Sequence, residues 1–190
     1  MAIENMDCAE IFSALLSQQK KAVSFHEQLC IVYNFMNLHG FKRWHEYQNV
    51  TESETMRDIY RHYIKHHDRL IKPLPLEEMN EIPNDWYNAD RSEVTSAIVA
   101  QYTKRGLQAH IQWETQSLEN LEAFAHRLFE LGEIGDYKFV TRLICDVSKE
   151  LEKVKRIYYK ITATGFDVVF IEEMQDEIHD KYKEMLKKCR

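Results

Sequence analysis

The chain has 190 residues, of which 44% are hydrophobic and 29% are charged, a composition typical of a folded globular protein rather than a disordered one. The formal net charge is −6 and there is no dense block of lysine and arginine, which argues against general nucleic-acid binding. The sequence starts without a basic segment leading into an apolar one, and no apolar run approaches the ~18 residues of a membrane span, so we expect a soluble, cytoplasmic protein without membrane contact.

The cysteine, glycine and proline content fits a helical protein of a reducing compartment. The four cysteines are Cys8, Cys30, Cys145 and Cys189, and they show neither a CxxC pair nor the spacing of zinc ligands. Cys30 and Cys145 lie in apolar helical stretches, so we predict that both are buried free thiols. Only five glycines and three prolines are present, which makes long uninterrupted helices easy to accommodate.

The first predicted helix runs from Asp7 to Leu38. Asp7 and Glu10 have the spacing of a capping box, and His39-Gly40 is a stop signal. In between, residues recur at alternating intervals of four and three and form a stripe that is apolar except for one glutamine. This stripe consists of Ile11, Leu15, Gln18, Ala22, Phe25, Leu29, Val32 and Met36.

The second predicted helix runs from Phe41 to about Ile71, and its middle part is unusually polar. Residues 72–90 contain all three prolines and are expected to form a long connection. A third helix then begins at Asp90 or Ser92 and continues to Leu131, with a bend expected at its single glycine, Gly106.

A fourth helix is predicted from Asp136 to about Ala163, after a short turn at residues 132–135, and a shorter amphipathic fifth helix follows Gly165. Short turns make the first two helices, and the third and fourth, antiparallel hairpins, and the 19 residues between the hairpins can cross a bundle. We therefore predict one domain over residues 1–190, with an all-α, up-and-down four-helix bundle, one long crossover connection and a short C-terminal fifth helix. This is the ferritin-like arrangement.

Each of the four long helices has a potential metal ligand on or beside its apolar stripe. The candidates are His26, Glu52, Glu114 and Glu150, with Asp146 next to the last. A carboxylate on an inner face is costly to desolvate unless it is paired, protonated or bound to a metal. Because helical bundles build di-iron and di-manganese sites from one such group on each helix, the pattern indicates a two-metal site.

Two segments resemble the ferritin family. Residues 37–48 (NLHGFKRWHEYQ) and the TESET sequence of residues 51–55 resemble the entry to the second ferritin helix. The GDYKF sequence that begins at Gly135 resembles a ferritin connection into the fourth helix. The resemblance spans roughly residues 20–155. It also extends to an uncharacterised ferritin-like group of bacteria and phages, which implies no known activity.

Transferred to this sequence, the Glu-x-x-His pair of the second ferritin helix falls on Glu52 and Thr55, so that the histidine ligand is absent. The ligand of the first helix falls nearest His26 or Glu27, and His26 is favoured because Glu27 points outward from the apolar stripe. Tyr33, one heptad after His26, resembles the tyrosine that ferritins place near their iron.

Glu114 corresponds to the glutamate of the third helix, and Asp146 or Glu150 to the ligand of the fourth. The resemblance thus implies a ferritin-like bundle with a degenerate carboxylate di-metal site, in which iron or manganese would fit hard oxygen ligands and one imidazole. Oxidation of Fe(II) by dioxygen is the implied reaction. The alternative is a non-catalytic helical protein, of phage or mobile-element type, that has lost the metal site and forms homo-oligomers or binds a protein partner.

The position of each candidate ligand can also be explained without a metal ion. A second capping-box pattern begins at Thr51, so that a helix could start there and leave Glu52 exposed. His26 could be a hydrogen-bonded core histidine. Glu114 could pair with a lysine or arginine across the bundle, and Glu150 has three basic neighbours that favour a solvated edge.

A cluster of histidines near the end of the second helix is the other chemical feature. His62, His66 and the His67-Asp68 dipeptide resemble the His-Asp pair of metal-dependent phosphohydrolases. Because such a dipeptide is common by chance, and histidines at i and i+4 of an amphipathic helix usually face solvent, we expect these side chains to be solvent-exposed.

Overall fold

The structure, a computed structural model, describes residues 3–74, 90, 92 and 94–189. Within these residues it consists of helices and contains no strand, which confirms the predicted all-α fold class. The elements are a short 3-10 helix at Ile3–Asn5 and five α-helices: α1 Cys8–Phe35, α2 His39–His67, α3 Ser96–Glu130, α4 Ile134–Ala163 and α5 Val168–Lys188.

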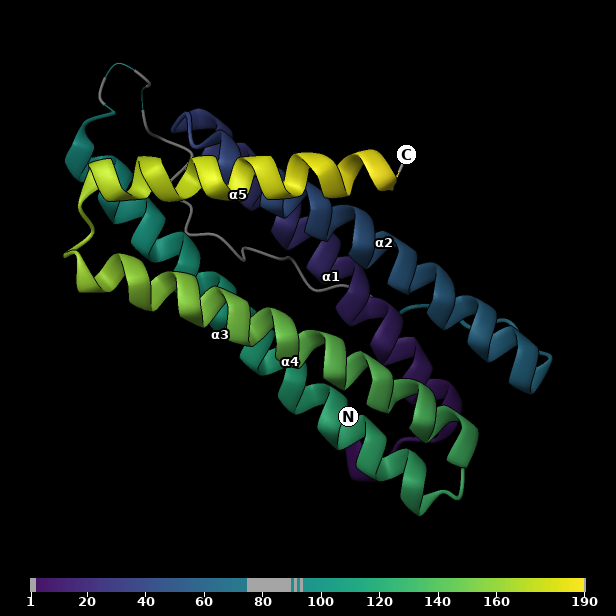
Figure 1. Cartoon of the computed structure of the whole chain (residues 1–190). Helices are drawn as coiled ribbons and strands as arrows, with labels where there is room; N and C mark the ends of the chain where they lie inside the picture. The colour runs from purple at the N-terminus through teal and green to yellow at the C-terminus, as the bar shows by residue number, and fades with distance from the viewer. Residues whose placement is uncertain (1–2, 75–89, 91, 93, 190) are drawn as a thin grey trace.

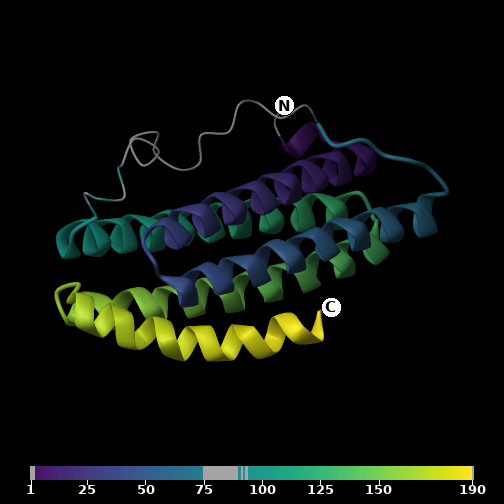
Figure 2. The ribbon, with the colours of Figure 1, turned by 90° about the horizontal axis from the view of Figure 1, so that it is seen from above.

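The four long helices form two antiparallel hairpins, α1–α2 and α3–α4, that lie side by side (Figures 1 and 2). The fifth helix packs against α2 at the end of the molecule where α2 begins and α4 ends (Figure 1). Most of the predicted crossover connection lies outside the described residues. Before that gap the chain runs along α1, where the Ser17 hydroxyl donates to the Leu74 carbonyl oxygen at 3.1 Å.

Helix α1 starts as its sequence predicts. The Asp7 carboxylate accepts a hydrogen bond from the Glu10 amide, and the Glu10 carboxylate accepts one from the Asp7 amide, both at 2.9 Å. This reciprocal capping box satisfies two of the amide groups that an α-helix leaves unpaired at its first turn.

Helix α2 does not restart at its second capping-box pattern. It runs without interruption through Thr51, whose hydroxyl donates to the Tyr47 and Gln48 carbonyl oxygens of the preceding turn. The reading in which a helix begins at Thr51 and exposes Glu52 is therefore wrong. The helix ends at His67, earlier than expected, because Asp68 adopts the left-handed conformation with a φ of 51°.

Helix α3 begins at Ser96 rather than at Asp90 or Ser92, and the Thr95 hydroxyl accepts from the Ile98 amide at its N-terminus. The four cysteines are free thiols, as predicted, but Cys30 is only partly buried and Cys145 is exposed. Neither side chain is therefore the core residue that its apolar neighbours suggested. Among the described residues, no helix is long and apolar enough to cross a membrane.

Two apolar clusters form the core, one at each end of the hairpins. One cluster contains Phe25, Trp44, Leu107 and Leu151 among its members, and the other contains Leu16, Ile59, Leu121 and Val140. On each long helix, the stretch between these two sets contains buried or half-buried polar side chains. A polar layer thus divides the hydrophobic core about halfway along the helices.

Candidate metal centre

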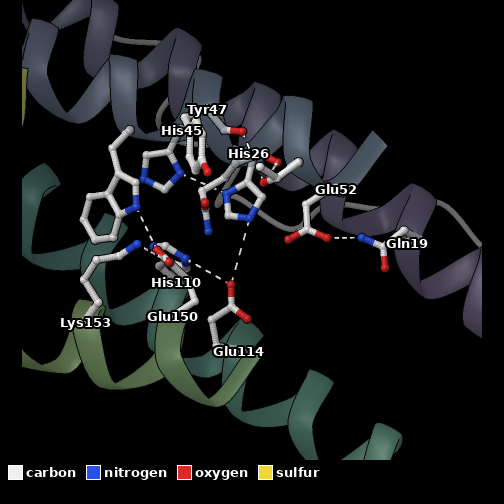
Figure 3. A network of polar contacts seen from close by, with 12 residues as sticks. Gln19, His26, His45, Tyr47, Glu52, His110, Glu114, Glu150 and Lys153 are labelled. Atoms are coloured by element: carbon white, nitrogen blue, oxygen red, sulfur yellow. Dashed lines mark hydrogen bonds and ion pairs between the residues drawn. The ribbon is translucent and has the colours of Figure 1, made fainter. Parts of the chain in front are cut away.

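Three buried histidines from three helices form the middle of the polar layer (Figure 3). They are His26 of α1, His45 of α2 and His110 of α3, and each is 0% exposed. Their ring centroids lie 5.0 to 5.2 Å from one another. Nδ1 of His26 and Nδ1 of His45 are 2.9 Å apart, so that one ring donates a hydrogen bond to the other.

Glu114 of α3 completes this cluster. Its Oε1 atom lies 3.1 Å from Nε2 of His110, one helical turn earlier, and 4.0 Å from Nε2 of His26 on α1. Its side chain is almost fully buried. His26, His110 and Glu114 each offer a ligand atom within 4.8 Å of the other two, which places two imidazoles and a carboxylate around one point.

The histidine rings have hydrogen-bonding capacity that the protein does not use. Nε2 of His26, Nε2 of His45 and Nδ1 of His110 are buried and have no hydrogen-bond partner among the described residues. A buried polar atom without a partner costs about 1–3 kcal/mol. Three such atoms in one cluster indicate that the layer is built for something other than stability.

Burial keeps the imidazoles of this cluster neutral. It lowers the pKa of His26 and His45 well below the usual value, an effect to which the charge of His110 adds. Burial also lowers the pKa of His110 to about 4. Neutral imidazole is the form that binds metal ions, because protonation occupies the nitrogen lone pair.

Two of the carboxyl groups around this cluster are protonated up to neutral pH. Burial, together with the nearby carboxylates, raises the pKa of both Glu114 and Glu52 to about 8. Glu52 comes from α2 and accepts a hydrogen bond from the side-chain amide of Gln19 on α1 (Figure 3). The centre therefore combines neutral bases with acidic protons that a cation can displace.

A cavity of about 540 Å³ adjoins the centre. Its wall includes Glu52, Glu114 and Glu150, and its apolar part includes Leu15, Ala22, Trp113, Leu121, Leu143, Val147 and Met185. A cavity of this size, with acidic groups in its wall, can hold several water molecules or a small molecule such as dioxygen.

Glu150 of α4 has partners of its own. It accepts a hydrogen bond from Nε1 of Trp44 at 2.8 Å and forms an ion pair with Lys153 on the next turn of α4. The Lys153 ammonium also lies over the ring of Trp44, 5.6 Å from its centroid. Glu150 is thus neutralised by a cation of the protein itself. Its side chain is only 12% exposed, so the reading in which its basic neighbours place it at a solvated edge is wrong.

The remaining sequence-predicted residues lie at the edge of this centre or beside it. Asp146 is mostly exposed and pairs with Lys149 at 3.0 Å, although it also borders the cavity. Thr55 borders the cavity, and its hydroxyl donates to the Thr51 carbonyl oxygen. The buried ring of Tyr33 stacks on His45, with a centroid distance of 5.3 Å, and this contact restricts the orientation of the His45 ring.

Sequence reasoning missed His45 and His110, and spacing could have found both. His45 precedes Glu52 by seven residues and His110 precedes Glu114 by four, so that each histidine lies on the same helical face as a predicted carboxylate. Glu114 pairs with histidines rather than with the lysine or arginine that the reading without metal required.

The close packing of α3 against α1 next to Tyr33 depends on Gly106. A Cβ atom at this position would lie 2.4 Å from the hydroxyl oxygen of Tyr33 and 3.1 Å from its Cζ atom. The tyrosine ring cannot yield easily, because it is packed between Phe41 and His45. This close approach gives Gly106 a packing role within α3, which continues through this position.

We expect Gly106→Ala to destabilise the protein by about 1–3 kcal/mol, since overpacking of a filled core outweighs the gain in helix propensity. Chemical denaturation measures the change. Tyr33→Phe is the matched variant, because the buried Tyr33 hydroxyl has no partner among the described residues and its removal should cost nothing. In a Tyr33→Phe background the cost of Gly106→Ala should fall, and equal costs in both backgrounds would contradict this explanation.

Comparisons of the chain with protein-family models, with curated proteins and with solved structures found no match.

Proposed function

We propose that the protein binds one divalent transition-metal ion per chain through His26, His110 and Glu114, inside a ferritin-like four-helix bundle. The observation that carries this proposal is the convergence of two neutral, fully buried imidazoles and one buried carboxyl group on a single point. Fe(II) is the ion that we favour, because two histidines and one carboxylate with open positions are the ligand set of mononuclear non-haem iron sites.

The distances between the ligand atoms support a shared ion. Metal–nitrogen and metal–oxygen bonds of ~2.1 Å place neighbouring ligand atoms about 3.0 Å apart at right angles and about 3.4 Å apart in a tetrahedron. Glu114 Oε1 lies 3.1 Å from Nε2 of His110 and 4.0 Å from Nε2 of His26. Small side-chain rotations therefore suffice to bring all three atoms onto one cation.

His45 would orient His26 for metal binding. When Nδ1–H of His26 donates to Nδ1 of His45, the Nε2 atom of His26 keeps its lone pair and points toward Glu114. Metal-bound histidines commonly donate their other N–H group in this way, which fixes both the tautomer and the ring position. This gives His45 a positioning role rather than that of a fourth ligand.

One ion fits the charges better than two. A second ion would need Glu52 and Glu150, but the ion pair with Lys153 already neutralises Glu150. Glu52 would instead line the cavity beside the ion, where its protonated carboxyl group could donate a proton. We infer that dioxygen entering through the cavity would take one electron from an Fe(II) ion held there, giving Fe(III) and superoxide, a one-electron form of the Fe(II) oxidation that the resemblance to ferritins implies.

Anaerobic titration with Fe(II), followed by calorimetry, tests the proposal. We expect one ion per wild-type chain, and at least about 100-fold weaker binding in His110→Gln, because loss of even an outer-shell partner costs 10–100-fold. His126→Gln is the matched control, since His126 is an exposed histidine on the same helix. Air oxidation of the loaded protein then tests the oxidase reaction.

Three results would contradict the proposal of a one-ion site. Unaltered binding in His110→Gln would contradict the proposed ligands, and two ions per chain would favour the di-metal site of the ferritin resemblance. No binding at all would favour the alternative, a helical protein without a metal site that forms oligomers or binds a partner. Oligomerisation, a protein partner and a cytoplasmic location stay predictions from the sequence.

A further inference from the structure

A second cluster of ligand-type side chains lies at the far end of the hairpins from α5. Its centre is Asp136, which is only 2% exposed and lies in the first turn of α4. Around it are His62 and His67 from the end of α2 and Cys8, the first residue of α1. Both hairpins therefore contribute to one small polar site, through α1 and α2 of the first and α4 of the second.

Every member of this cluster is in contact with Asp136. Nε2 of His67 lies 2.8 Å from Oδ2, and Sγ of Cys8 lies 3.3 Å from the same oxygen. Nε2 of His62 lies 2.7 Å from the other oxygen, Oδ1. The Cys8 sulfur and Nε2 of His67 are 3.6 Å apart, which closes a triangle of sulfur, nitrogen and oxygen.

These contacts correct the expectation that the histidines of this region face solvent. The side chains of His62 and His67 are 11% and 21% exposed, whereas His66 is exposed and stacks on His62 at a centroid distance of 4.3 Å. The spacing of the three histidines along one helix is typical of a solvent-exposed face. It does not show that the start of α4 covers part of that face.

We propose that Cys8, His67 and Asp136 bind one Zn(II) ion, with His62 holding the second carboxylate oxygen of Asp136. This site is separate from the centre around Glu114, and no residue is shared between the two.

The triangle of donor atoms has the dimensions of a zinc site. With Zn–S near 2.3 Å and Zn–N and Zn–O near 2.0–2.2 Å, tetrahedral geometry places sulfur about 3.5 Å from nitrogen or oxygen, and nitrogen about 3.4 Å from oxygen. The corresponding distances here are 3.6, 3.3 and 2.8 Å. The nitrogen–oxygen edge has to lengthen most and the sulfur–oxygen edge slightly, and these are the two edges that hydrogen bonds now shorten.

Aromatic side chains hold the imidazole rings in place. Tyr63 stacks on His67 with a centroid distance of 4.6 Å, and Phe139 stacks on His62 at 4.1 Å. Phe12 contacts both histidine rings from α1. An apolar shell of this kind fixes the ligands and lowers the local dielectric constant, which strengthens the attraction of a thiolate and a carboxylate for a cation.

The site opens to a hollow of about 450 Å³ at the surface, whose wall includes Cys8, His67, Arg69 and Glu133. Three protein ligands and one position open to solvent distinguish reactive zinc sites from closed structural ones, which have four protein ligands. The fourth position here would be taken by water or by a small anion that enters through this hollow.

Ligand chemistry separates the two sites of the protein. A thiolate with an imidazole and a carboxylate favours zinc, while the centre around Glu114 has no sulfur ligand among the described residues. Burial and the neighbouring Asp136 carboxylate raise the pKa of Cys8, so that zinc binding must displace the thiol proton. That proton now makes the hydrogen bond to Asp136, which the ion would replace.

Titration of the metal-free, reduced protein with Co(II) tests the proposal, because cobalt bound to a thiolate shows a sulfur-to-metal charge-transfer absorption. We expect this absorption to reach its maximum at one thiolate-bound Co(II) per chain and to disappear on addition of Zn(II). The signal reports on a sulfur ligand and is blind to cobalt at the centre around Glu114.

Cys8→Ser should abolish the absorption, and His67→Gln should weaken Co(II) binding by at least about 10-fold. Cys145→Ser, which alters an exposed cysteine of α4, is the matched control and should leave it unchanged. Circular dichroism establishes that each variant is folded, and His67→Gln tests the site if Cys8→Ser is not. Absence of the absorption in the wild type, or its persistence in folded Cys8→Ser, would overturn the proposal.

Discussion

Glu114→Gln is expected to weaken Fe(II) binding at least about 100-fold and, at the same time, to stabilise the metal-free protein at alkaline pH. The first effect follows from the loss of the only carboxylate in the proposed ligand set, since an amide oxygen carries no charge to bind the cation. The second follows from the burial of Glu114. This residue is only 3% exposed, and its burial raises the pKa of its carboxyl group to about 8.

The sign of the stability effect follows from proton linkage. Because the folded protein holds the proton of Glu114 more tightly than the unfolded chain does, its carboxyl group contributes full stability below pH 4.5, the ordinary value. That contribution is lost progressively as the pH rises toward about 8. Glutamine resembles the protonated form at every pH, so the variant keeps the stability that the wild type loses.

Unfolding measured between pH 5 and pH 9 checks this prediction. The free energies of unfolding of the metal-free proteins should be similar at pH 5, and the variant should be more stable by up to about 5 kcal/mol at pH 9. Adding Fe(II) at 100 times the wild-type dissociation constant should stabilise the wild type by about 2.7 kcal/mol and the variant by about 0.4 kcal/mol at most. A variant that is less stable than the wild type at pH 9 would show that Glu114 serves the fold rather than a metal ion.

Gly40→Ala is expected to displace α5 and to destabilise the protein by about 3 kcal/mol or more. A Cβ atom at this position would lie 1.7 Å from the carbonyl oxygen of Gln175, a backbone atom that no side-chain rotation can move away. The amide of Gly40 also donates to the side chain of Gln175 at 2.9 Å. The first turn of α2 and the middle of α5 are therefore in direct backbone contact.

Displacement of α5 would expose part of the apolar core. Ile171, Met174, Ile178 and Tyr182 of this helix are buried against the same cluster as Trp44. Hydrogen exchange should therefore increase throughout α5 in the variant, and Tm should fall. Gly135→Ala is the matched control, because the nearest atom to its added Cβ, on His66, is 3.7 Å away and α4 should gain helix propensity. Equal stability of the two variants would contradict the predicted role of Gly40.

The sequence by itself determined the helices, because their signals are local. Hydrophobic periodicity placed five helices, and the Asp7–Glu10 pair predicted a cap that the structure contains. The cost of burying a charge on an apolar face singled out His26, Glu52 and Glu114, which surround one cavity or contact one another. Such inferences need only the geometry of a single helix.

Only the tertiary structure decided which of these faces meet. His45 and His110 complete the centre because α1, α2 and α3 are rotated so that the rings of His26, His45 and His110 lie in one layer. The rotation of a helix about its axis depends on all of its packing contacts, which the sequence of that helix does not give. Cys8 and Asp136 are 128 residues apart, yet they are in contact because two hairpins align their ends. A site assembled from separate helices is a property of their packing. The periodicity of one helix shows which of its residues face inward, but not which residues of other helices they meet.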